Sequence, residues 1–241
     1  MIDRFFFIHV MKTAGTTFAR QLQQQFPAEE IYPARGIDWR SPSDVEAYIN
    51  IPRLLALAPE RRSQIRVYTG HFPFMVRDLL DPGLATLTVL REPVDRTISI
   101  LKQFKRREAR FRDLPLEAVY DDRPIFRFFV ENHQTKVFCL APEDEEVAIN
   151  CGMDIDDARY ARARENLARV DAVGITEAYG DFLAEVRRRF GWWPDGVDVD
   201  QRENVSTEDW DVAPSFRARI AADNRYDVEL YEYARELIRR Q

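Results

Sequence analysis

Residues 4–26 read RFFFIHVM, then KTAGTT, then FARQLQQQF, and this stretch decides the fold class. The run at 4–11 is short, apolar and rich in Phe, which is typical of a buried strand. Residues 12–17 are mostly small, as in a turn. An apolar residue then recurs at every fourth position of residues 18–26, as on one helix face, until Pro27 ends the helix. The stretch therefore predicts a strand, a loop and a helix.

The rest of the chain alternates in the same way. Short apolar runs predict three more strands, at residues 64–69, 84–90 and 171–175. Helical patterns occur at residues 43–57, 78–80, 94–107, 125–140, 158–167, 177–190 and 215–240. Strands that alternate with helices predict an α/β fold with a mainly parallel sheet. The length of 241 residues and the 45% of apolar residues fit one domain over residues 1–241.

The charge balance restricts the partners that the chain can have. Lys and Arg total 35 against 41 Asp and Glu, a net charge of −6. This balance disfavours a broad nucleic-acid interface but leaves room for a local cationic pocket. Apolar runs stay far below the roughly 18 residues of a membrane span, and no signal-peptide pattern is visible. We therefore expect a soluble, cytoplasmic protein.

The cysteine and histidine content also fits a cytoplasmic protein without a metal site. Cys139 and Cys151 fit two reduced thiols in a cytoplasmic protein, and a disulfide between them is the alternative. The sequence has no CxxC or HExxH pattern and only three widely spaced His residues, so it predicts no metal site.

The loop at residues 9–17, HVMKTAGTT, has the residues of an anion-binding loop. It joins a predicted strand to a helix N-terminus, where main-chain N–H groups and the helix dipole favour negative charge. Lys12 adds a full charge, Gly15 allows close approach, and Thr16 and Thr17 offer hydroxyl groups. The loop differs from a Walker A loop, because its Lys precedes the Gly. It therefore suits phosphate or phosphosulfate, the alternative being a simple capped helix.

The second motif is LREPVDRTIS, at residues 90–99. Arg91 follows a predicted strand, at the edge where open α/β sheets bind ligands, and Ser99 lies about two helical turns further on. By itself the motif is typical of a surface turn. Together with the first loop, it could hold a second phosphate.

In combination, the two motifs resemble the two 3′-phosphoadenosine 5′-phosphosulfate (PAPS) signatures of the sulfotransferases. They are most similar to the carbohydrate branch that contains the heparan and dermatan sulfate uronyl 2-O-sulfotransferases. Further segments resemble that branch, at residues 68–72 (YTGHF), 132–136 (NHQTK), 173–177 (VGITE) and 227–234 (DVELYEYA). The resemblance runs in order over nearly the whole chain, from about residue 5 to 238.

The resemblance implies a P-loop-like three-layer fold, with PAPS as co-substrate, PAP as product and no metal. The residues implied at the 5′-phosphosulfate are Lys12, Thr13, Ala14, Gly15, Thr16 and Thr17. Arg91 and Ser99 would bind the 3′-phosphate. His71 would be the general base for the acceptor hydroxyl, and Lys12 would neutralise the leaving phosphate oxygen. Such a transfer depends on positioning and on cationic stabilisation more than on covalent chemistry.

The other two histidines have weaker expectations. His9 alternates with Phe7 on the first strand, which favours a buried, hydrogen-bonded histidine. His133 falls in a predicted helix, and contact with a ligand or acceptor stays open. The related branch often has a second His near the catalytic one, but Thr69 occupies that place here.

Three other features allow two interpretations each. The basic run at 102–112 is either a cationic face for an acidic glycan or a solvated helix face. Trp192, Trp193 and Trp210 fit the core better than a sugar-stacking role. Residues 202–206 (RENVS) could form a late loop beside the cofactor.

These features predict an enzyme, a PAPS-dependent O-sulfotransferase acting on the hydroxyl of a saccharide or glycolipid. The alternatives are a P-loop small-molecule kinase and a non-catalytic nucleotide-binding module of the same fold. The expected partner is a small-molecule or glycan acceptor, and we expect no nucleic-acid partner and no membrane span. The sequence does not indicate the oligomeric state.

Overall fold

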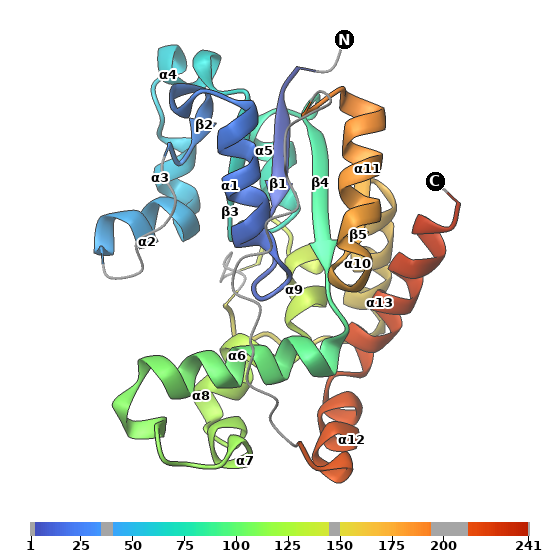
Figure 1. Cartoon of the computed structure of the whole chain (residues 1–241). Coiled ribbons are helices and arrows are strands. Elements are labelled where there is room, and N and C mark those ends of the chain that lie inside the picture. The colour runs from blue at the N-terminus through green and yellow to red at the C-terminus, as the bar shows by residue number, and fades with distance from the viewer. Residues whose placement is uncertain (1–2, 35–40, 145–149, 194–211, 241) are drawn as a thin grey trace.

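The described part of the chain, residues 3–34, 41–144, 150–193 and 212–240 of a computed structural model, forms a five-stranded sheet (Figure 1). The strand order is β2-β3-β1-β4-β5 and every neighbouring pair is parallel. The strands are β1 (Phe5–Ile8), β2 (Ile31–Tyr32), β3 (Val67–Gly70), β4 (Ala85–Leu90) and β5 (Ala172–Ile175). The predicted α/β fold with helices on both sides of the sheet is confirmed.

The central strand explains why its sequence is apolar at every position. Phe5 and Phe7 pack into the core on one face of the sheet, and Phe6 and Ile8 pack into the core on the other. A strand buried on both faces has no solvent-facing side, so the two-residue alternation of polar side chains disappears.

Helices cover both faces, as Figure 1 shows. The helices are α1 (Gly15–Gln25), α2 (Pro42–Ile49), α3 (Ile51–Leu55), α4 (Pro59–Gln64), α5 (Met75–Leu80), α6 (Pro93–Arg107), α7 (Leu116–Tyr120), α8 (Arg123–Ile125), α9 (His133–Cys139), α10 (Asp157–Ala168), α11 (Tyr179–Phe190), α12 (Pro214–Asp223) and α13 (Arg225–Ile238). Short 3-10 turns occur at Ala28–Glu30, Ala109–Phe111 and Thr176–Ala178, and a π-helical turn at Phe126–Val130.

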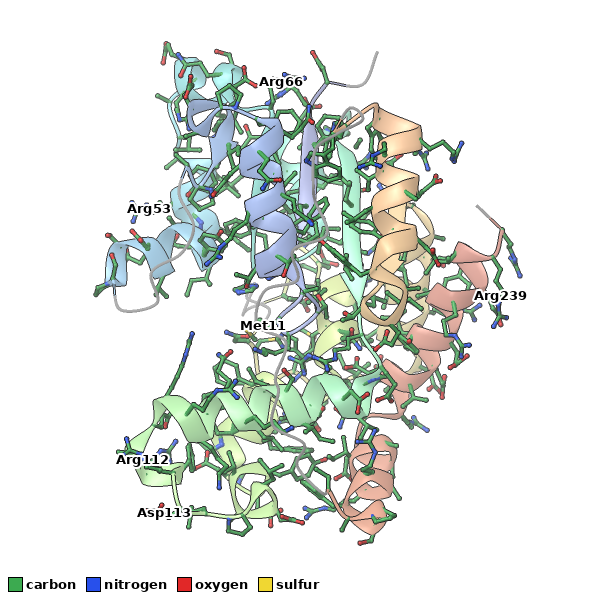
Figure 2. All side chains as sticks on the ribbon, viewed as in Figure 1. Met11, Arg53, Arg66, Arg112, Asp113 and Arg239 are labelled. Atoms are coloured by element: carbon green, nitrogen blue, oxygen red, sulfur yellow. The ribbon has the colours of Figure 1, made fainter. Side chains whose placement is uncertain are left out.

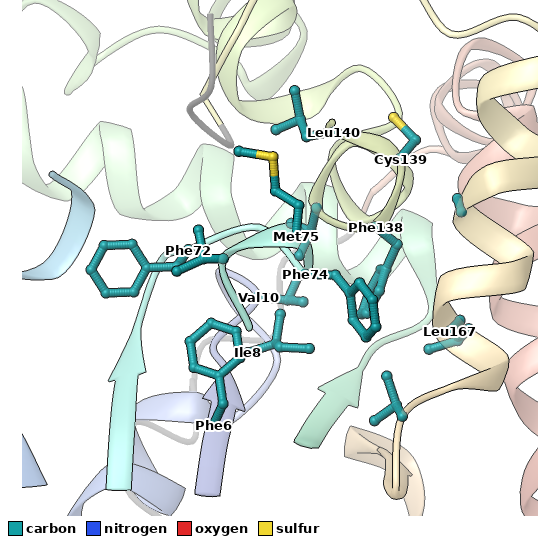
Figure 3. Packing of buried hydrophobic residues seen from close by; sticks show 14 of the residues in the cluster. Phe6, Ile8, Val10, Phe72, Phe74, Met75, Phe138, Cys139, Leu140 and Leu167 are labelled. Carbon is teal, nitrogen blue, oxygen red and sulfur yellow. The ribbon is translucent and has the colours of Figure 1, made fainter. Parts of the chain in front are cut away.

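Each layer buries its own set of side chains. Helices α1 and α11 pack on the face that carries Phe5 and Phe7, and Trp192 and Trp193 complete that core. Helices α3, α5, α9, α10 and α13 pack on the face that carries Phe6 and Ile8. Figure 3 shows Met75 of α5, Phe138 of α9 and Leu167 of α10 in this core. The core position predicted for these two Trp residues is confirmed.

A third hydrophobic cluster lies beyond the carboxyl ends of the strands. It joins α6, α7, α8 and α12, and Figure 1 shows α6 running across below the strand ends. The strand order also reverses at β1, with β3 on one side and β4 on the other. The loops after β1 and β4 therefore border the edge where open α/β sheets bind ligands.

Three predicted helices are divided in the structure. The predicted helix at 43–57 becomes α2 and α3, because the side chain of Asn50 caps α3 by accepting from the N–H of Arg53. The helix predicted at 125–140 is interrupted at Asn132, whose φ is 44°. The helix predicted at 215–240 is interrupted at Asn224.

The last two interruptions meet in space. The main-chain N–H of Asn132 donates to the side-chain oxygen of Asn224 over 2.8 Å. In return, the side-chain oxygen of Asn132 accepts from the N–H of Tyr226 over 3.1 Å. These bonds satisfy buried main-chain groups that the helix interruptions leave unpaired. Sequence periodicity alone therefore missed both interruptions, together with the short strand β2 and helix α4.

Two further properties bear on the expectations above. Within the described ranges, no helix is long and apolar enough to cross a membrane. Cys139 and Cys151 are both buried and both free thiols, and burial raises the pKa of Cys139 to about 12.

Candidate active site

The loop between β1 and α1 has an unusual main-chain conformation. Lys12 has φ 69° and Ala14 has φ 65°, both in the left-handed region that L-residues seldom occupy. The hydroxyl of Thr13 donates to the carbonyl of Val10 over 2.9 Å, so this side chain stabilises the loop from within. Helix α1 then starts at Gly15 without a side-chain cap and without an acidic residue in its first turn. Its N-terminus therefore keeps its partial positive charge.

Side chains from α6 and from the β4–α6 loop hold this loop in place. The guanidinium of Arg91 donates to the carbonyl of Lys12 over 3.3 Å. The buried Arg96 donates from Nε to the carbonyl of Met11 over 3.2 Å, and Met11 lies between the sheet and α6 (Figure 2). The Nζ of Lys12 donates to Oε1 of Gln103 on α6 over 3.0 Å. The two sequence motifs are therefore brought together, as predicted.

Positive charge accumulates at this point of the molecule. Burial, together with the charges of Arg106, Arg107, Arg91 and Arg96, lowers the pKa of Lys12 to about 8. Among the described residues, no carboxylate lies within ion-pair distance of Lys12, Arg91, Arg96 or Arg106.

Arginines elsewhere on the surface are commonly paired. Arg110, for example, contacts both Glu108 and Asp122. Cations that lie close to one loop repel one another, so an anion that binds there is stabilised by their charges.

Arg96 is the most deeply buried of these cations. Its side chain is fully buried, and Nη1 donates to the carbonyl of Phe129 over 2.8 Å. Its Nη2 has no hydrogen-bond partner among the described residues. Burial lowers the pKa of Arg96 to about 10. The sequence motif contained this residue, but spacing alone assigned it no role.

His71 lies beside the start of the same loop. Its Nδ1 is 2.7 Å from the main-chain oxygen of His9. Because a carbonyl oxygen can only accept, Nδ1 carries the hydrogen and Nε2 carries the lone pair. Burial lowers the pKa of His71 to about 4, so the ring is neutral near pH 7. The side chain is only 4% exposed and is therefore covered, although it adjoins the Lys12 loop.

His9 is a neighbour of this ring and not the hydrogen-bonded histidine that the sequence suggested. The ring centroids of His9 and His71 are 4.4 Å apart. Nδ1 of His9 is buried and finds no partner in the described part of the chain. Burial and the charges of His71 and Lys12 lower the pKa of His9. The prediction of burial is confirmed, and the prediction of a satisfied side chain is wrong.

The ring of His9 also explains why residue 15 is Gly. A Cβ atom at Gly15 would lie 1.9 Å from Cδ2 of His9, far inside van der Waals contact. The sequence suggested that Gly15 lets an anion approach the main chain. In the structure its missing side chain accommodates the imidazole.

The remaining predicted residues have distinct environments. Thr16 is exposed at the first turn of α1, and Thr17 is buried. Ser99 is half-buried on α6, one turn before Gln103. Gln103 was not predicted from the sequence, although its four-residue spacing from Ser99 on one helix face could have indicated it.

His133 is fully buried, and neither ring nitrogen has a hydrogen-bond partner within the described residues. In this conformation it cannot contact an acceptor. No group of three or more His, Cys, Asp or Glu side chains in the described ranges is placed to hold a metal ion.

The basic run at 102–112 is divided between two environments. The charges of Arg106 and Arg107 act on Lys12 and help to lower its pKa. Lys105 donates to the carbonyl of Leu114, and Arg110 is in surface ion pairs. Trp210 and residues 202–206 lie outside the described residues.

No family model matches this chain, and no curated protein matches it.

Proposed function

We propose that this protein is a PAPS-dependent O-sulfotransferase that transfers a sulfuryl group to the hydroxyl of a saccharide or glycolipid. The observation that carries the proposal is the placement of a neutral Nδ1–H histidine, His71, beside a loop on which several cationic side chains act. The proposal also rests on the resemblance of the two loop motifs to the PAPS signatures of sulfotransferases.

The residues present fit a ligand that carries two separate anionic groups. Lys12, Gly15, Thr16 and Thr17 surround the N-terminus of α1 and would hold the 5′-phosphosulfate, with Thr13 and Ala14 shaping the loop. Arg91 and Ser99 would hold the 3′-phosphate. When bound, PAPS supplies an activated sulfuryl group and leaves as PAP.

The two catalytic residues have complementary roles. Nε2 of His71 would take the proton of the acceptor hydroxyl. The hydroxyl oxygen would bond to sulfur while the bond from sulfur to the phosphate oxygen breaks. The Nζ of Lys12 would neutralise the charge that this phosphate oxygen gains. The pKa of His71 is about 4 without ligand, because burial and the charge of Arg96 disfavour imidazolium. An anion nearby reduces this penalty and raises the pKa toward the range useful for a general base.

The proposal is tested by comparing the affinities of PAP, AMP and ATP, with and without Mg²⁺. We expect PAP to bind at least tenfold more tightly than AMP, because a second phosphate adds charge-assisted hydrogen bonds. Equal affinity for PAP and AMP would contradict the proposal. Tight binding of ATP that requires Mg²⁺ would favour a kinase instead.

The acceptor is identified by incubating the protein with labelled PAPS and pools of saccharides, glycolipids and small metabolites. Mass spectrometry of the labelled products locates the sulfated hydroxyl. PAP binding without transfer to any pool would favour the non-catalytic nucleotide-binding alternative.

A further inference from the structure

A single side chain holds both main-chain polar groups of Arg91. Oε1 of Gln134 accepts from the N–H of Arg91 over 3.0 Å. Nε2 of Gln134 donates to the carbonyl of Arg91 over 2.9 Å. The main-chain partners define the orientation of the amide, because the N–H can only donate and the carbonyl can only accept. Gln134 is itself 1% exposed, and both bonds are partly buried.

Gln134 is fixed in turn by Asp227 on α13. The buried carboxylate of Asp227 accepts from the N–H of Gln134 over 3.1 Å and from the N–H of Thr135 over 2.7 Å. It also accepts from the hydroxyl of Thr135 over 2.8 Å. These bonds satisfy main-chain donors at the start of α9 and leave the Gln134 side chain little freedom. Two of the segments that the sequence analysis singled out without a role, at 132–136 and 227–234, are thus in direct contact.

The geometry points to Gln134 as a positioning residue for Arg91. Arg91 follows the last residue of β4, where strand pairing no longer fixes the main chain. The Gln134 amide supplies that missing constraint, and the Arg91 guanidinium then reaches the carbonyl of Lys12. Since the proposed function places the 3′-phosphate at Arg91, we infer that Gln134 sets the affinity for that phosphate without touching it.

The substitution Gln134→Glu tests this role with little change in shape. A glutamate at this position still accepts from the N–H of Arg91, but when ionised it cannot donate to the carbonyl, which is left unsatisfied. We expect PAP to bind about tenfold more weakly, the effect of one lost buried hydrogen bond. AMP lacks the 3′-phosphate, so its affinity is expected to be unchanged.

A double-mutant cycle with Arg91→Ala separates positioning from general stability. The alanine keeps the main-chain groups that Gln134 holds but removes the side chain that Gln134 positions. We therefore expect Gln134→Glu to have no further effect on PAP affinity in the Arg91→Ala background. Its effect on thermal stability is expected in both backgrounds. The matched control is Asn166→Asp, which removes a side-chain amide that donates to the carbonyl of Phe138 over 2.8 Å, away from Arg91.

The outcomes distinguish this inference from the proposed function. If wild-type protein binds PAP and AMP equally, the proposed function fails. If wild type discriminates but Gln134→Glu weakens both ligands alike, or still weakens PAP in the Arg91→Ala background, the positioning role is wrong. Should the glutamate variant not fold, Gln134→Asn serves the same test, because its shorter amide cannot reach both groups of Arg91.

Discussion

The ring nitrogen Nδ1 of His71 donates to the main-chain oxygen of His9, and this bond ties the end of β3 to the end of β1. Each of the two residues immediately follows its strand. The N–H of His9 also donates to the carbonyl of Gly70 over 3.2 Å. The bond selects one tautomer of His71 and fixes its ring against the loop that carries Lys12. The chemistry proposed for this protein depends on that tautomer.

Replacing His71 by alanine is expected to separate binding from transfer. Nε2 is the proposed proton acceptor, and general-base groups typically contribute about 10²–10⁴-fold to a rate. Labelled-PAPS transfer should therefore fall by at least about 100-fold, while PAP affinity measured by calorimetry changes little. His133→Leu is the matched control, since His133 is also buried but makes no hydrogen bond among the described residues. Equal loss of transfer in both variants would contradict the assignment.

Binding of PAP is expected to take up a proton above about pH 8. The pKa of free Lys12 is lowered to about 8, and a bound anion stabilises its ammonium form and raises that pKa. The affinity should therefore fall as the pH rises through and above this value. Calorimetry at pH 8.5 in two buffers of different ionisation enthalpy measures the uptake. In Lys12→Arg the uptake should vanish, because guanidinium stays charged. Uptake that persists in that variant would assign the proton to another group.

Gly15→Ala is expected to destabilise the protein through His9. The new Cβ would lie 1.9 Å from the His9 ring, so the ring or the helix must move. Overpacking of this kind costs about 1–3 kcal/mol. In a His9→Ala background the space is empty, and the same substitution should cost little. Urea unfolding of the four proteins gives the coupling free energy. Additive effects of the two substitutions would show that the contact is unimportant.

Acidification is expected to lower the free energy of unfolding, because His71 is protonated at a higher pH in the unfolded chain than in the folded protein. Its pKa is lowered from 6.5 to about 4 in the folded protein, so between these values the unfolded state binds more protons. Stability therefore rises with pH across this window and is lost as the pH falls through it. With about 1.4 kcal/mol per unit, wild type should lose about 3 kcal/mol more than His71→Ala between pH 7 and pH 4.

Urea unfolding at a series of pH values measures this difference. Both proteins contain the same carboxyl groups, so their own acid titration cancels in the comparison. Parallel curves for wild type and His71→Ala would show that His71 is protonated equally easily in both states.

Much of the architecture could be predicted from local patterns. The run at 4–11, the β-branched run at 84–90 and the alternation of strands with helices defined the α/β class. The two motifs proposed to bind anions were also visible, because strand, loop and helix are adjacent in the sequence. Predicted helix ends were less accurate where an interruption depends on a distant partner, as with Asn132 and Asn224.

The candidate site depended more strongly on tertiary contacts. His9 and His71 are 62 positions apart in the sequence, and the hydrogen-bonded pair Arg91 and Gln134 is 43 positions apart. Spacing along the chain gives no signal for such pairs, since they meet only when separate strands and helices pack.

The sequence by itself determined a parallel α/β fold and one loop suited to an anion, because hydrophobic periodicity and turn chemistry act over a few neighbouring residues. Only the tertiary structure decided that Arg96 lies beneath that loop, that the His9 ring fills the space beside Gly15, and that Gln134 holds Arg91. These contacts constrain the structure because they are buried. In the close-packed interior, an unpaired polar group or an overlap between atoms costs free energy that water cannot offset.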